Sequence, residues 1–94
     1  MKTQVSSASR VKINHEVLFQ ELQGEAVLLN LKSGIYLGLD AVGTRVWNLL
    51  QQHELLQDVL NAMLQEYEVS EDQCAKDLLR LVGEMEQQGI AEIQ

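Results

Sequence analysis

The chain contains no proline, one cysteine and only seven lysine and arginine residues among its 94 residues. A lone Cys74 excludes an internal disulfide and a thiolate metal site, and a reducing cytoplasm is the simplest setting for such a chain. No run of about 18 apolar residues occurs, and the amino terminus lacks the apolar core of a signal peptide. We therefore expect a cytoplasmic protein with no membrane partner.

The residue types that carry catalysis are also poorly placed. His15 and His53 have no partner at metal-ligand spacing, and the glycines are not spaced as a phosphate-binding loop. Cys74 falls on the apolar side of a predicted helix, where a free cysteine usually behaves as a small hydrophobic residue. We therefore expect no catalytic residue, no metal, no cofactor and no enzymatic activity.

The apolar pattern that is present predicts one small α+β domain. Residues 1–14 are expected to form a flexible amino-terminal tail, because their first ten are rich in Ser, Gln and Thr and cannot offset their own ordering entropy. The folded domain is expected over residues 15–94. It begins with three strands in an antiparallel meander, separated by short glycine-containing connections: Val17–Leu22, Ala26–Leu31 and Ile35–Leu39.

After Asp40, which is placed to cap a helix, the apolar spacing changes to a helical period. The first helix is predicted to end near Gln52-His53, the second to run over about Leu55–Tyr67, and the third to run from a Ser70 cap to about Gln88. The short, mainly apolar segment Ile90–Ile93 either packs back on the core or adds a strand. A three-stranded antiparallel sheet followed by three helices is winged helix-turn-helix-like.

That architecture makes a DNA-binding regulator the main alternative function. The third helix would read the DNA, but from Glu71 to Gln88 it carries five acidic residues and two basic ones. The whole chain has a net charge of −7. Because affinity for phosphate comes mainly from Lys and Arg, we expect no nucleic-acid partner.

The strand Ile35–Leu39 is uncharged and is the last strand of the meander. Charged residues or proline usually protect an edge strand against pairing with other chains. An edge strand without them suggests that another strand pairs with it. The pairing strand could belong to a peptide or to a second copy, and a structural subunit that dimerises in this way is a further alternative. Gly83, inside the third helix, either lets another backbone approach or relieves crowding against the sheet.

The segment Val27–Leu50, with its strand-Gly-Tyr-strand-helix-Trp pattern, resembles the PqqD-like family, named for a protein of pyrroloquinoline quinone biosynthesis. Supporting matches are Glu66–Val69, Met85 and Gly89-Ile90, and the resemblance covers about Val17–Ile93. The chain departs from the quinone-pathway protein in lacking the aromatic and proline-glycine pattern of its second hairpin. It looks more like the stand-alone leader-binding proteins of lasso-peptide clusters.

The resemblance implies a RiPP recognition element, a non-catalytic domain that binds the leader segment of a ribosomally made precursor peptide. Such a domain presents the precursor to a processing enzyme, which can be a leader peptidase, a cyclase or a radical enzyme. In the family the leader adds to the third strand and lies against the third helix, and the domain is expected to be a monomer or a weak dimer through the edge strand. The positions implied as peptide contacts are Ile35, Tyr36, Leu37, Gly38 and Leu39 on the strand, and Lys76, Leu79, Arg80 and Gly83 on the helix.

Overall fold

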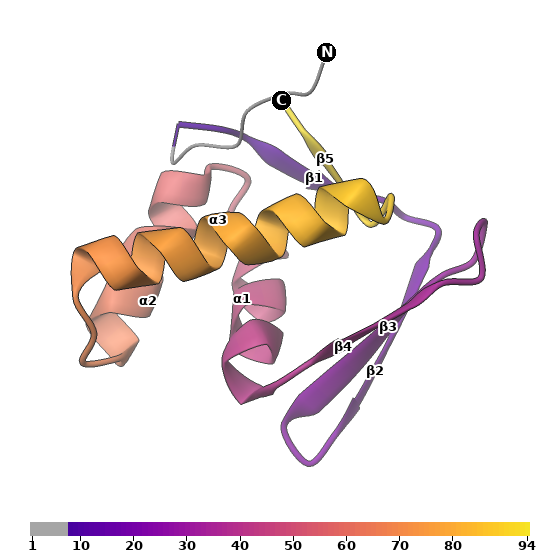
Figure 1. The fold of residues 1–94 in the computed structure, drawn as a ribbon, viewed down its shortest axis with the longest axis horizontal. Coiled ribbons are helices and arrows are strands. Elements are labelled where there is room, and N and C mark those ends of the chain that lie inside the picture. Colours follow the sequence, from indigo (N-terminus) through magenta and orange to yellow (C-terminus); the bar gives the residue numbers. More distant parts are fainter. Residues whose placement is uncertain (1–7) are drawn as a thin grey trace.

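The computed structural model describes residues 8–94. The α+β architecture is confirmed, with a three-stranded antiparallel sheet followed by three helices and a small second sheet (Figure 1). The elements are β1 (Val11–Ile13), β2 (Val17–Leu22), β3 (Glu25–Asn30), β4 (Tyr36–Leu39), α1 (Ala41–Leu50), α2 (Leu56–Glu66), α3 (Glu71–Gln87) and β5 (Ala91–Ile93).

The larger sheet has the strand order β2-β3-β4, and its two connections use the left-handed backbone conformation. Gln23 and Gly24, between β2 and β3, have φ of 56° and 82°, as a tight hairpin turn of the primed type requires. Gly34 has φ of 74° in the connection to β4. The buried Asn30 fixes this connection, because its Oδ1 accepts from Lys32 N at 2.9 Å and its Nδ2 donates to Gln88 O at 2.8 Å. The turn before β4 is thereby tied to the end of α3.

The helices begin where the sequence predicts. The Asp40 carboxylate accepts from Gly43 N at 2.8 Å and caps α1. The Ser70 hydroxyl accepts from Gln73 N at 3.2 Å and caps α3, but the Gln73 side chain donates to Asp77 rather than returning to the cap. The predicted Ser70 cap is therefore present, without the return hydrogen bond that would make it a capping box.

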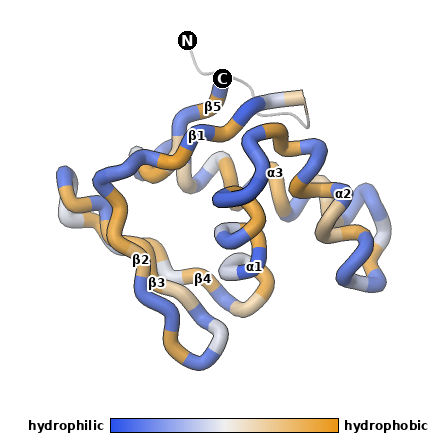
Figure 2. Tube along the Cα trace, turned by 180° about the vertical axis from the view of Figure 1, so that it is seen from behind, coloured by the Kyte–Doolittle hydropathy of each residue, from blue (hydrophilic) through white to orange (hydrophobic). Residues whose placement is uncertain are grey.

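The core lies between the inner face of the sheet and the three helices. Its fully buried large side chains come from β3, α2, α3 and the segment just before β5: Leu28, Leu56, Val59, Val82, Met85 and Ile90. Trp47 of α1 is 5% exposed and stacks on Phe19 of β2, with ring centroids 5.9 Å apart. Hydrophobic residues run along much of β2 and β3 (Figure 2), and the outer face of the sheet consequently exposes several apolar side chains.

The two ends of the described chain form the small sheet. β1 pairs antiparallel with β5, and Arg10 and Gln94 exchange backbone hydrogen bonds of 3.0 and 2.8 Å. The tail expected over residues 1–14 therefore does not extend to residue 14, since residues 9–14 belong to the fold; residues 1–7 lie outside the described residues. Ile90–Ile93 takes the second of its two expected roles by adding a strand. Within residues 8–94, no helix has the length and apolarity needed to cross a membrane.

Candidate functional site

The larger sheet ends in two open edges, β2 and β4. β4 has no charged residue and no proline, and Ile35 immediately before it joins the ladder through a hydrogen bond from Asn30 N to Ile35 O at 3.0 Å. Tyr36 is 67% exposed and Ile35 is 48% exposed, and these side chains lie on opposite faces of the sheet, so both faces are open to solvent at this edge. The edge that the sequence predicts is thus present in the structure.

The register shows which backbone groups of β4 are free to pair. β3 and β4 pair as Leu28↔Leu37 and Leu29↔Tyr36, in the same register as the Asn30–Ile35 hydrogen bond. In an antiparallel ladder, directly hydrogen-bonded pairs alternate with pairs that are not bonded. Leu37 therefore turns its peptide groups toward β3, whereas Tyr36 and Gly38 turn theirs toward the open side.

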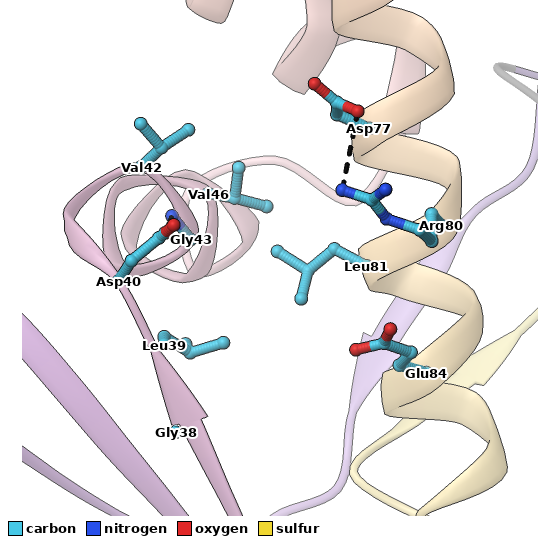
Figure 3. A pocket seen from close by; sticks show the side chains of 10 residues that line it. All are labelled: Gly38, Leu39, Asp40, Val42, Gly43, Val46, Asp77, Arg80, Leu81 and Glu84. Atoms are coloured by element: carbon cyan, nitrogen blue, oxygen red, sulfur yellow. Dashed lines mark hydrogen bonds and ion pairs between the residues drawn. The ribbon is translucent and has the colours of Figure 1, made fainter.

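A cleft of about 680 Å³ lies between β4, the first turns of α1, and α3 (Figure 3). Leu39 and Leu81 point toward each other across it, and Val46 lies beside them. Leu39 and Val46 are buried, while Val42 near the mouth is 46% exposed. Leu39, Leu81 and Val46 give the cleft an apolar floor alongside the open strand.

The rim of the cleft carries three carboxylates and one guanidinium: Asp40, Asp77, Glu84 and Arg80. Arg80 Nη2 lies 3.4 Å from Asp77 Oδ1, but both side chains are well exposed, so this ion pair stabilises the fold little. Glu84 takes part in no ion pair within residues 8–94. Gly43 lines the cleft from the first turn of α1, where an added Cβ would lie 3.2 Å from Asp40 Oδ1 and 3.3 Å from Leu39 Cβ.

The structure brings together some of the residues expected at the site and separates others. Gly38, Leu39 and Arg80 line the cleft, and Tyr36 lies on the open strand. Lys76, Leu79 and Gly83 do not line it. Leu79 is two residues before Leu81, and two residues are about 200° around a helix, so these two side chains leave α3 on different sides.

The cleft residues that the sequence interpretation missed as site residues are Asp40 at the cap of α1, Val42, Gly43 and Val46 on α1, and Asp77, Leu81 and Glu84 on α3. The three α3 residues, together with Arg80, are spaced i, i+3, i+4 and i+7, which is a signal that they share one helix face. Gly83 does not relieve crowding, because a Cβ added there would meet no described atom within 4 Å.

The titratable groups with shifted pKa values lie away from the cleft. Arg45 donates two hydrogen bonds of 2.7 Å to the Glu66 carboxylate, which raises the pKa of Arg45 and lowers the pKa of Glu66. Burial raises the pKa of the Cys74 thiol, and Asp77 adds to the shift. Across residues 8–94, no three His, Cys, Asp or Glu side chains are grouped so that they could hold a metal ion.

Comparison with known proteins gives one family and two solved structures. The family model described as coenzyme PQQ synthesis protein D (PqqD) matches residues 25–91. TbiB1, solved in complex with the TbiA(beta) leader peptide, is 33% identical over 86% of this chain and 94% of its own, with a TM-score of 0.80. A lasso peptide synthetase B1, complexed with the leader peptide, shares the fold at 24% identity and a TM-score of 0.67, covering 88% of this chain and 98% of its own. No curated protein matches the chain.

Proposed function

The chain belongs to the PqqD family, and on that premise we propose that it is a RiPP recognition element that captures the leader segment of a precursor peptide. The leader adds as a fourth strand to the open side of β4 and lies in the cleft against α3. Residues from about 9 to 94 form the leader-binding domain.

One observation carries this proposal: an uncharged edge strand runs alongside a cleft with an apolar floor. The outward peptide groups of Tyr36 and Gly38 supply main-chain hydrogen bonds, which give affinity without reading side chains. Side chains of an added strand alternate between its two faces. Every second leader residue therefore points into the cleft toward Leu39 and Leu81, and the others lie on the outer face of the sheet. Support also comes from TbiB1, which has a similar fold and was solved with a leader peptide bound.

The family comparison and the cleft chemistry support a role in presentation rather than catalysis. The cleft is lined by aliphatic side chains, carboxylates and one arginine, without a nucleophile paired to a base. We propose that a separate processing enzyme, which can be a leader peptidase, a cyclase or a radical enzyme, acts on the precursor held by this chain. The exposed apolar side chains on the outer sheet face, Leu18 and Val27 among them, offer that enzyme a surface next to the bound leader.

Selection from a randomised display library of ten-residue peptides tests strand capture. The wild-type protein should enrich peptides with alternating side-chain character, and a fluorescent copy of an enriched peptide should bind with saturable anisotropy. Leu37→Lys, which puts a charge beside the core, serves only as an unfolding control. Failure of the folded wild-type protein to enrich any peptide would contradict the proposal. So would an enriched peptide that binds the edge variant Tyr36→Pro as tightly as it binds the wild type.

The same edge also serves self-association. If two copies pair through β4, a dimer should form at high concentration and dissociate when peptide is added. Analytical ultracentrifugation with and without the enriched peptide measures this competition. We propose a monomer or a weak dimer, because two copies each carry a net charge of −7 and repel one another.

A further inference from the structure

Gly38 lies in the middle of β4, and nothing in the described fold requires a glycine there. Its backbone is not in the left-handed region, unlike that of Gly24, Gly34 and Gly89. A Cβ built on Gly38 would meet no described atom within 4 Å. Because glycine weakens a strand interior, a glycine without a conformational or packing reason often marks a place where another molecule comes close.

The surroundings of Gly38 indicate what kind of group that would be. Gly38 pairs with Val27 of β3, so the missing side chain would stand on the outer sheet face beside Val27. Tyr36, two residues earlier on β4, is on the same face. The side chains of Val27 and Tyr36 are 45% and 67% exposed. We call the space over Gly38, between these two side chains, the Gly38 notch. The notch is open, apolar and adjacent to the free edge of β4.

We propose that the Gly38 notch receives a large apolar or aromatic side chain of the leader residue that pairs with Gly38. This inference rests on the proposed function, since it specifies one position of the captured strand. In paired strands, directly opposite Cβ positions are about 4.5–5.5 Å apart and diagonal neighbours are still within reach of aromatic side chains. A large side chain opposite glycine can therefore lie across the glycine, reaching Val27 beyond it and Tyr36 on the diagonal.

The Gly38 notch is continuous with the binding edge of β4, so a strand added to that edge supplies its occupant. The notch opens toward the side of β4 to which the Gly38 peptide groups point, so an added strand necessarily places a side chain at its mouth on every second residue. A second copy that pairs through β4 could fill the notch with its own Tyr36, and this is the competing occupant that the experiment must separate.

Gly38→Val is the informative variant, because it fills the notch without disturbing the fold. Valine favours strands, and its Cβ has free space, so the melting temperature should equal or exceed that of the wild type. Gly83→Ala is the matched control: Gly83 also has free space around its Cβ and lies outside the cleft. The randomised ten-residue display library is selected separately against the wild type, Gly38→Val and Gly83→Ala.

Peptides enriched by the wild type and by Gly83→Ala should share Phe, Tyr, Trp or Leu at one position, and Gly38→Val should lose this preference. Replacing that residue with Ala should weaken binding to the wild type by about two- to fivefold, and to Gly38→Val by much less. An equal loss of affinity with the wild type and Gly38→Val would contradict the proposed role of the notch. So would a wild-type dimer that Gly38→Val abolishes without altering the peptide preference. Neither result would contradict strand capture. If the wild type enriches no peptide, both strand capture and the proposed role of the notch are contradicted.

Discussion

Replacing Tyr36 with proline removes one hydrogen-bond donor from the open edge of β4. The Tyr36 N–H points away from β3, so its loss takes nothing from the sheet itself, and Leu37 and Leu39 continue to face β3. An intramolecular or intermolecular hydrogen bond contributes about 0.5–1.5 kcal/mol net, which corresponds to a loss of about two- to twelvefold in peptide affinity. The proline ring can increase this loss by blocking close approach of the added strand.

Three variants isolate this effect. Tyr36→Val removes the tyrosine side chain but keeps the N–H, so the difference between Tyr36→Pro and Tyr36→Val reports the hydrogen bond. Glu21→Pro makes the same backbone change on β2: the Leu31 N to Glu16 O bond of 2.9 Å sets the ladder so that Glu21 N–H also points outward. Leu37→Pro removes a donor that faces β3 and should lower the melting temperature.

The assay is a fluorescence anisotropy titration with one library-enriched peptide, after circular dichroism has shown that each variant is folded. Tyr36→Pro should bind more weakly than Tyr36→Val, and Glu21→Pro should bind as the wild type does. Equal affinity of Tyr36→Pro and Tyr36→Val would refute the reasoning, as would a loss of affinity in Glu21→Pro.

Three further results are expected. Leu81→Ser should weaken peptide binding by about fivefold or more, because it removes part of the apolar floor of the cleft. Leu79→Ser, on another side of α3, should leave peptide affinity unchanged. A larger loss of affinity with Leu79→Ser than with Leu81→Ser in the anisotropy titration would place the peptide on the other face of α3. Glu66→Gln should lower the melting temperature at pH 7, because it removes the ion pair with Arg45. The Arg45 guanidinium lowers the pKa of Glu66 in the folded state, so the ion pair stabilises the fold above the ordinary Glu pKa of 4.5 and stops doing so as Glu66 becomes protonated. The difference in melting temperature between variant and wild type should therefore shrink as the pH falls below 4.5. Duplex DNA should not bind near physiological salt, since α3 is acidic, and sub-micromolar affinity in a gel shift would revive the regulator alternative.

The main elements of the fold follow from local signals. Asp40 and Ser70 cap the helices that they were expected to cap, and each carries the side-chain oxygen that an exposed backbone N–H needs. β1 had no such signal, and β5 was expected only as one of two alternatives for Ile90–Ile93. These two strands have three residues each, and Val11 pairs with Ile93 at the other end of the described chain. A pairing between such distant short segments depends on the core that forms between them.

The open edge strand was predictable from the sequence, and the helix residues that line the cleft were predictable only in part. An uncharged final strand is visible in the sequence, and the meander leaves it at an edge. The face of α3 that meets the cleft depends instead on how that helix rotates against α1 and β4. Leu79 and Leu81 both border the buried arc of α3, one on each flank, so the helical period alone does not distinguish them. The structure does so by placing Leu81 across from Leu39 (Figure 3).

Amide hydrogen exchange of the wild-type protein, measured by NMR with and without a saturating library-enriched peptide, tests strand addition most directly. The Tyr36 and Gly38 amides point outward in the free protein, so a fourth strand should slow their exchange, while the outward amides of Phe19 and Glu21 on β2 should be unaffected. Slowed exchange at Phe19 and Glu21, or unchanged exchange at Tyr36 and Gly38 when the peptide is bound, would contradict capture of the leader by β4.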